Sequence, residues 1–84
     1  FSVRQLVTLI RRLARAGYAD DAERLIRVLG RRAPEDRHLP GLMLLVAETY
    51  RKAGNAIMKD ALITRLHTEY PDSEEARMTK LLGN

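Results

Sequence analysis

Residues 6–34 read LVTLIRRLARAGYADDAERLIRVLGRRAP, and a related stretch, MLLVAETYRKAGNAIMKDALITRLHTEYP, follows 37 positions later at residues 43–71. In both stretches apolar residues recur at intervals of three and four, which is the spacing of one face of an α-helix. The chain therefore contains one two-helix unit used twice, and stacked units of this kind bury a shared core. The matched apolar columns are Leu6 with Met43, Leu9 with Val46, Ile10 with Ala47, Leu13 with Tyr50, Leu25 with Leu62, Ile26 with Ile63 and Leu29 with Leu66.

Capping signals mark several ends of these helices. Ser2 and Gln5 match a capping box, in which each residue satisfies a backbone N–H of the first turn. Gly17 and Gly54 follow the first and third helices, where a left-handed glycine commonly closes the last turn. Asn55 is a preferred N-cap for the helix that comes next.

The remaining boundaries follow from acidic residues and prolines. Asp20 or Asp21 is expected to cap the second helix, and Pro34 and Pro71 prevent the second and fourth helices from continuing. No stretch alternates apolar and polar residues as a strand would. We therefore predict an all-α chain of antiparallel helix pairs, with helices over residues 2–16, 20–31, 40–53, 56–69 and 73–82.

The chain is expected to form a single domain over residues 1–84, with a first repeat at 2–36, a second at 39–73 and a capping helix at 73–82. The capping helix should cover the fourth helix with its apolar residues Ala76, Met78, Leu81 and Leu82. The repeated inward columns predict buried positions at Leu25, Ile26, Leu29, Leu42, Val46, Tyr50 and Leu62. Because the sequence starts at Phe1 rather than Met, we expect it to be a segment of a larger protein.

Composition restricts the classes of protein that this chain can belong to. Of its 84 residues, 45% are hydrophobic and 31% are charged, which fits a globular chain rather than a disordered one. No run of 18 apolar residues occurs, so direct membrane insertion is not expected. The absence of cysteine excludes disulfides and thiol chemistry. It fits either a reducing or an oxidising compartment, so the localisation stays undetermined. We favour the cytoplasm slightly, and the periplasm stays open.

The positive charge is concentrated in the first repeat. Residues 1–37 carry nine arginines against five acidic residues, whereas residues 38–84 carry six basic residues against six acidic ones. This asymmetry is compatible with a solvated surface, and it is also compatible with an anionic partner.

No set of residues in the chain forms a recognisable catalytic constellation, so we do not expect an enzyme. His38 and His67 lie in a linker and on a helix, without acidic partners at ligand spacing, so neither a metal nor a cofactor is predicted. Ser2 and Ser73 occupy helix-capping positions outside any nucleophile elbow. The chain also lacks a glycine-rich phosphate loop.

The pattern resembles the tetratricopeptide repeat family. The first unit carries the resemblance in Gly17, Ala22, Ile26, Leu29 and Pro34, and the second in Met43, Val46, Ala47, Tyr50, Gly54, Ile63, Leu66, Tyr70 and Pro71. The EYPDS stretch at residues 69–73 is similar to that of bacterial members. The resemblance implies a short right-handed superhelix of helix pairs whose concave groove binds a protein partner.

Two departures from the family pattern are expected to alter the geometry of the second unit. The family repeat has 34 residues, so three extra residues must lie in the linker over residues 35–39. Lys59 stands in the column that Ala22 fills in the first unit, where a small residue normally permits close helix contact. We therefore expect a changed angle between the units and a splayed or shifted fourth helix.

The resemblance also implies which residues line the groove. Carrying over the lining columns gives Arg4, Val7, Arg11, Ala14 and Arg15 in the first unit, and Gly41, Leu44, Glu48, Arg51 and Lys52 in the second. A helical wheel independently places Arg4, Arg11 and Arg15 on the side opposite the Leu6, Leu9 and Leu13 stripe. The partner-binding residues we predict are Arg4, Val7, Arg11, Arg15, Leu44, Glu48, Arg51 and Lys52.

An apolar and basic groove favours an acidic or carboxylate-ended peptide, because arginine binds carboxylates through two parallel hydrogen bonds. The family's carboxylate-binding members use asparagines that are missing from these columns.

Three alternatives stay open: a solvated arginine face, binding of nucleic acid or another polyanion by the first repeat, and self-assembly within a membrane-associated complex. Nucleic acid is less favoured, because no aromatic residues are interleaved with the arginines. Self-assembly would use exposed repeat ends at Phe1, Val3, Val7, Leu81 and Leu82.

Overall fold

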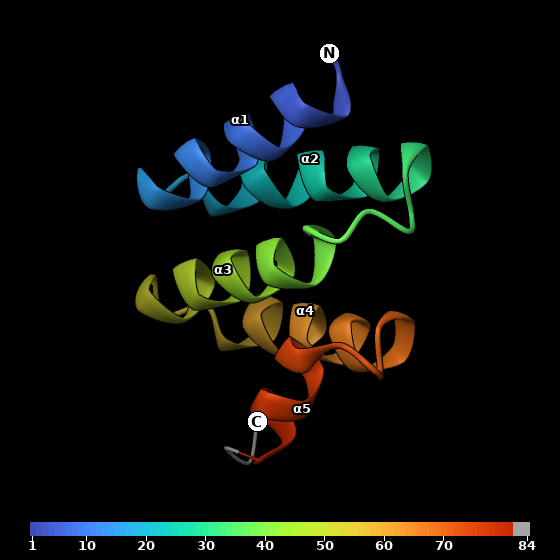
Figure 1. Ribbon diagram of the computed structural model, residues 1–84. Coiled ribbons are helices and arrows are strands. Elements are labelled where there is room, and N and C mark those ends of the chain that lie inside the picture. Colours follow the sequence, from blue (N-terminus) through green and yellow to red (C-terminus); the bar gives the residue numbers. More distant parts are fainter. Residues whose placement is uncertain (82–84) are drawn as a thin grey trace.

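A computed structural model describes residues 1–81, and this part of the chain is entirely helical outside its turns and linkers. The helices are α1 (Val3–Arg15), α2 (Ala19–Arg32), α3 (Leu39–Lys52), α4 (Ala56–Glu69) and α5 (Glu74–Leu81). Figure 1 shows the antiparallel pair α1 and α2 stacked on the antiparallel pair α3 and α4, with α5 at the far end. The predicted all-α class is confirmed, and the first four helices match their predicted bounds to within one residue.

The ends of α1 and α3 share one backbone motif, which explains the paired glycines of the two repeats. Gly17 has φ +90° and Gly54 has φ +80°, a left-handed conformation that glycine adopts without steric cost. The N–H of the residue after each glycine donates to a carbonyl five residues earlier, from Tyr18 to Leu13 at 2.8 Å and from Asn55 to Tyr50 at 2.9 Å. These bonds complete a Schellman motif at both positions.

The predicted caps of α1 and α4 are present. The Ser2 N–H donates to Gln5 Oε1 at 2.8 Å, and the Gln5 N–H donates to Ser2 Oγ at 3.1 Å, which completes the capping box. Asn55 Oδ1 accepts from the Met58 N–H at 3.1 Å at the start of α4.

The expected cap of α2 by Asp20 or Asp21 is wrong. The helix begins earlier, at Ala19, and Tyr18 at the N-cap makes no side-chain capping bond. The reason is the Schellman motif, which ends at Tyr18 and leaves no intervening residue before the next helix. Both aspartates therefore lie in the first turn, where their charge complements the positive end of the helix dipole.

Helix α3 is the centre of the core, because it contacts each of the other four helices. It buries seven side chains, Leu39, Pro40, Leu42, Met43, Val46, Ala47 and Tyr50. Of the seven core positions predicted from the repeat, six are buried: Ile26, Leu29, Leu42, Val46, Tyr50 and Leu62.

Leu25, the seventh predicted core position, is only half-buried. Its repeat partner Leu62 is 2% exposed. The two helices have equally many neighbours, since α2 contacts α1 and α3 while α4 contacts α3 and α5, so the number of helix neighbours does not account for this difference in burial.

The fourth helix differs from the second in its first two turns. In α2, Ala19 and Ala22 are buried, whereas α4 buries only Leu62, Ile63 and Leu66. Lys59, which stands in the column of Ala22, is half-buried and places its Nζ 3.3 Å from Asp60 Oδ1. A lysine keeps its charged end in water even when its stem packs, so this part of α4 lies less deeply buried than the matching part of α2.

The capping helix packs on α3 and α4, but only in part through the side chains that the sequence predicted. Ala76 is buried as expected, whereas Met78 is 49% exposed and Leu81 is 86% exposed, and Thr79, which was not predicted, is buried as well. The Thr79 hydroxyl donates to the Ala76 carbonyl at 3.0 Å and lies 2.6 Å from His67 Nε2 on α4. The inward face therefore centres on a small residue and a satisfied polar contact. Leu82 lies outside the described residues.

Truncation of the buried leucines should destabilise the fold more than truncation of Leu25. Leu29→Ala and Leu62→Ala each remove a fully packed side chain, and each should lower the free energy of unfolding by about 2–5 kcal/mol. The matched substitution Leu25→Ala should cost clearly less. Urea denaturation followed by circular dichroism measures all three. Equal losses at the three positions would contradict the packing described above.

Candidate interaction face

Helices α1 and α3 lie side by side and contact each other, so their outward sides form one face of the molecule. Two cavities open on this face. The first, about 500 Å³, lies between α1 and the linker before α3 and is lined by Val3, Arg4, Val7, Thr8, Arg11, Asp36, Arg37 and His38. The second, about 410 Å³, lies between the ends of α1 and α3 and is lined by Ala14, Arg15, Gly17, Leu45, Glu48, Thr49, Lys52 and Ala53. A hollow of similar volume, about 430 Å³, lies on the side of α2 and α4, so volume alone does not distinguish the two cavities described here.

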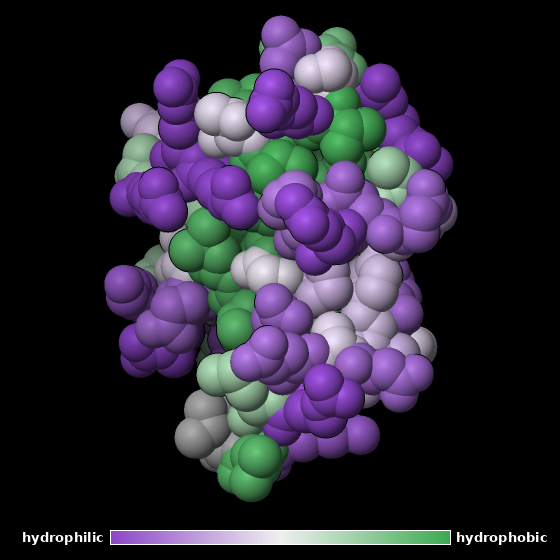
Figure 2. Space-filling model, in the orientation of Figure 1, coloured by the Kyte–Doolittle hydropathy of each residue, from purple (hydrophilic) through white to green (hydrophobic). Residues whose placement is uncertain are grey.

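Apolar atoms reach the surface on this side of the molecule. Figure 2 shows a band of hydrophobic side chains that starts near α1 and continues over α3, with hydrophilic groups on both sides of it. Val3, Leu44 and Leu45 are half-buried and pack against the core. We call the surface formed by α1, α3 and the two cavities the α1/α3 face.

The structure brings most of the predicted partner-binding residues onto this face. Three of them, Arg4, Val7 and Arg11, line the first cavity, and three others, Arg15, Glu48 and Lys52, line the second. Leu44 and Arg51 line neither cavity.

The apolar floor of this face differs in detail from the predicted one. Val7 is only 5% exposed, so most of its surface already packs in the core. Leu44 is half-buried against the same core. Leu45 lines the second cavity and was not among the predicted residues. Leu45 stands 37 positions after Thr8, which lines the first cavity, so the repeat relates the two lining residues to each other.

The positive charge of this face comes mainly from α1. The sequence of α1 contains four basic residues and no acidic one. Arg4, Arg11 and Arg15 are exposed, and none of them forms an ion pair with another residue of the described chain. Three neighbouring guanidinium groups without a carboxylate partner attract anions, because like charges on one face add to a common field.

The charges of α3 are more nearly balanced. Arg51 Nε donates to Glu48 Oε2 at 2.9 Å, and a second guanidinium N–H of Arg51 donates to Glu48 Oε1. The hydrogen bonds from Arg51 lower the pKa of the Glu48 carboxyl below its ordinary value. The Glu48 carboxylate therefore already accepts hydrogen bonds from Arg51. Lys52, which lines the same cavity, adds an exposed positive charge.

The linker between α2 and α3 has a fixed local conformation beside the first cavity. Asp36 Oδ1 accepts from the His38 N–H at 2.8 Å and lies 2.9 Å from His38 Nδ1. The bond from the His38 backbone N–H, the largest influence, lowers the pKa of Asp36. At the other side of the linker, the Tyr70 hydroxyl donates to the Pro34 carbonyl at 2.7 Å and ties the second repeat to the first.

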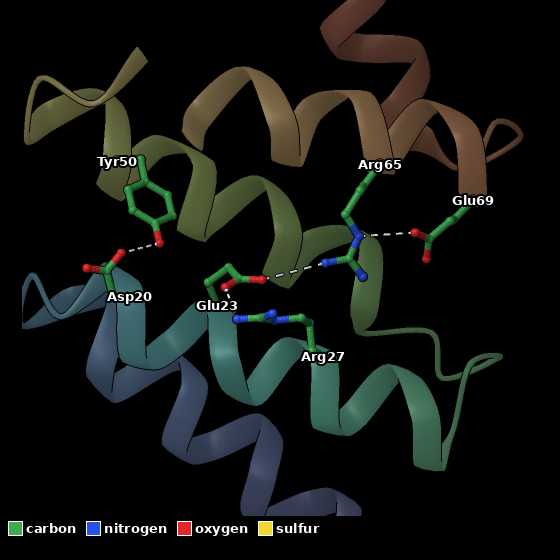
Figure 3. A network of polar contacts seen from close by, with 6 residues as sticks. All are labelled: Asp20, Glu23, Arg27, Tyr50, Arg65 and Glu69. Carbon is green, nitrogen blue, oxygen red and sulfur yellow. Dashed lines mark hydrogen bonds and ion pairs between the residues drawn. The ribbon is translucent and has the colours of Figure 1, made fainter. Parts of the chain in front are cut away.

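A polar network on the other side of α3 joins α2 to α4 (Figure 3). Glu23 is 9% exposed, accepts from Arg27 Nη2 at 2.8 Å and places Oε2 3.8 Å from Arg65 Nη1. Arg65 Nε also donates to Glu69 at 3.1 Å. The sequence analysis did not find this network, because its members lie on two helices that touch only through side chains.

Tyr50 extends the same side of the molecule towards the start of α2. Its hydroxyl donates to Asp20 Oδ1 at 2.6 Å, as Figure 3 shows. Burial, together with this hydrogen bond and the charge of Asp20, raises the pKa of the Tyr50 phenol above its ordinary value. Asp20 therefore anchors the second repeat to the first instead of capping its own helix.

Neither histidine stands in a metal-binding arrangement. His38 contacts Asp36 and His67 contacts Thr79, and residues 1–81 contain no group of three or more His, Cys, Asp or Glu side chains that could hold a metal ion. Within the same residues, every helix is too short or too polar to cross a lipid bilayer.

The repeat ends expose fewer apolar residues than the sequence suggested. Phe1 is 80% exposed and Leu81 is 86% exposed, but Val3 is half-buried and Val7 is buried. Leu82 falls outside the described part of the chain. Ile57 on α4 is 83% exposed and was not predicted as part of an end surface.

Comparison of the chain with known protein families, with curated proteins and with solved structures finds no match. A functional assignment therefore depends on the chain's own residues and their geometry.

Removal of the Tyr50 hydroxyl should weaken the fold in a pH-dependent way. Tyr50→Phe removes a hydrogen bond to a carboxylate, so it should lower the free energy of unfolding at pH 7 by about 1–3 kcal/mol. Because the folded-state pKa of Tyr50 is raised, its stabilisation is complete below about pH 10, the ordinary tyrosine pKa, and declines above it.

Stability of the unsubstituted chain should therefore fall as the pH rises above about 10, and Tyr50→Phe should show a smaller fall over the same interval. Part of the decline should persist, because burial also raises the pKa of Tyr70. Tyr18→Phe is the matched control, since Tyr18 is 59% exposed and its hydroxyl makes no hydrogen bond within residues 1–81. Urea denaturation at each pH gives the free energies. Identical pH profiles for Tyr50→Phe and the unsubstituted chain would refute the role of the hydroxyl.

Proposed function

We propose that this chain is a non-catalytic protein-interaction module that binds an acidic peptide segment of another protein on its α1/α3 face. The observation that carries the proposal is the row of exposed α1 arginines without ion-pair partners, beside half-buried leucines of α3. An apolar strip with a basic border suits a segment that combines acidic and apolar side chains.

We further propose that the two helix pairs form a short right-handed superhelix of the tetratricopeptide type, with α5 as its capping helix. The 37-residue repeat, the Schellman motifs at the ends of α1 and α3, and the position of α3 against both helices of the first pair support this arrangement. In such an array α1 and α3 are the first helices of their repeats, and they border a common groove.

The two sides of the molecule differ in how far their charges are neutralised. The carboxylates of Glu23 and Glu69 already pair with arginines on the side of α2 and α4. On the α1/α3 face, by contrast, Glu48 and Asp36 already accept hydrogen bonds, and the third acidic residue, Glu75, lies beside Gly41 at the start of α3. This difference favours the α1/α3 face as the place where an acidic partner binds.

Double substitution of Arg11 and Arg15 by alanine should weaken binding and leave the fold intact. The probe is a panel of fluorescein-labelled decapeptides that alternate glutamate with leucine, set against matched decapeptides with glutamine. An exposed ion pair contributes about 0.2–1 kcal/mol, so the loss of two should weaken acidic-peptide binding by about two- to thirtyfold. Fluorescence anisotropy over a range of NaCl concentrations measures the affinity, which should fall as salt rises.

The matched control replaces Arg24 and Arg31 of α2, which removes the same charge from another part of the surface. This control should bind the acidic peptides almost as well as the unsubstituted chain. A fluorescein-labelled single-stranded oligonucleotide is the competing ligand. If it binds more tightly than the peptides and its affinity falls steeply with salt, the chain binds polyanions instead. If the two double variants behave alike, the α1 arginines are an ordinary solvated surface.

A further inference from the structure

We propose that the cavity between α1 and the α2–α3 linker is a carboxylate subsite, which holds the acidic end of the bound segment. This inference rests on the proposed function and deepens it, because it names the place where the charge of the partner is recognised. It also adds Arg37, which lies in the linker and outside the repeat columns, to the residues that determine specificity.

Charge is the first argument for this subsite. Arg4, Arg11 and Arg37 line the cavity, and each is exposed and without an ion pair inside the described chain. Asp36 is the one acidic residue among the lining side chains, and its Oδ1 accepts from the His38 backbone N–H and lies 2.9 Å from His38 Nδ1. The cavity therefore presents three guanidinium groups against one carboxylate that already accepts hydrogen bonds.

The position of the cavity in the fold adds to this charge. It lies along the first half of α1 and directly before α3, which starts at Leu39. The N-terminal ends of helices carry partial positive charge, so α3 contributes a favourable field to an anion bound there. The C-terminal ends of α1 and α3 lie instead at the second cavity, where the dipoles disfavour an anion.

The lining of the cavity combines its arginines with an apolar side chain. Val3, which is half-buried, supplies apolar contact for the methylene groups of a glutamate or for the last residue of a peptide. The lining contains no Phe, Tyr or Trp, and its one ring, the imidazole of His38, lies 2.9 Å from Asp36 Oδ1 through Nδ1. Arginine side chains pair with carboxylates through two parallel hydrogen bonds, which gives such a site geometric specificity.

The second cavity complements the first and gives the bound segment a direction. Ala14, Leu45 and Ala53 line it together with Thr49, whose hydroxyl donates to the Leu45 carbonyl at 2.9 Å. This cavity suits an apolar side chain. A segment with an acidic end and an apolar residue further along would therefore lie with its acidic end near the linker.

The experiment uses an ¹⁵N-labelled sample of the 84-residue chain and two small probes. N-acetyl-triglutamate amide carries only side-chain carboxylates, and N-acetyl-trialanine carries only a terminal carboxylate. We expect saturable amide shifts centred on residues 3–11 and 36–38 with at least one probe, and the stronger probe identifies the source of the carboxylate. Shifts of equal size around the arginines of α2 would overturn the subsite.

Arg37→Gln tests the linker residue, and Arg31→Gln is its matched control, since both arginines are exposed and have no ion pair within residues 1–81. Arg37→Gln should weaken binding of the stronger probe at least threefold, and Arg31→Gln should leave it unchanged. Thermal melting confirms that both variants keep the fold. Equal affinities for the two variants would overturn the role of Arg37.

The same two variants separate this inference from the proposed function. If the acidic decapeptides bind and depend on Arg11 and Arg15 but not on Arg37, the α1/α3 face binds peptides and the subsite inference is wrong. If the decapeptides do not bind while the small probe still binds the cavity in an Arg37-dependent way, the subsite stands as an anion site and the peptide function is wrong.

Discussion

The packing of α3 against the first helix pair is the interaction on which the rest of the structure depends. Helix α3 contacts all four other helices and buries seven of its fourteen residues. Without it, α1 and α2 would form an isolated hairpin, and α4 and α5 would have no core to cover. Ala47 and Tyr50 show how this packing works, because a small residue allows close approach while the tyrosine reaches Asp20 with its hydroxyl.

This arrangement also separates the charges that form ion pairs from the charges that do not. The apolar sides of α3 face α1, α2 and α4, so polar links between the repeats form at the margins of the core. On the side of α2 and α4, Glu23 and Arg65 bridge helices whose backbones do not touch. Their charges are then neutralised within the fold, whereas the arginines of α1 project to solvent. The distribution of unpaired charge is therefore a consequence of which helix faces the core requires.

The linker before α3 connects fold and candidate function. Its length exceeds what the resemblance to the tetratricopeptide family implies, and the additional residues do not form a loose loop. Asp36 binds the His38 backbone, and Pro34 accepts from Tyr70, so both ends of the linker are held. A held linker can keep Arg37 beside α1 at little cost in conformational entropy, which a mobile loop could not do.

The sequence by itself determined the number, type and limits of the helices, because these depend on local interactions. The capping box, the Schellman glycines and the prolines act within a few residues, and the glycines and prolines recur in both repeats. Six of the partner-binding residues predicted from the sequence line the two cavities of the α1/α3 face.

The tertiary structure decided the remainder. Leu25 and Met78 follow helical spacing, yet Leu25 is half-buried and Met78 is 49% exposed, because spacing does not determine how closely a neighbouring helix covers a side chain. Arg37 could not be found from periodicity, since a linker has none, and its neighbours in space come from α1. The sequence alone determines which side of each helix is apolar, whereas the burial of a side chain and the pairing of charges depend on helices that are far apart in the sequence.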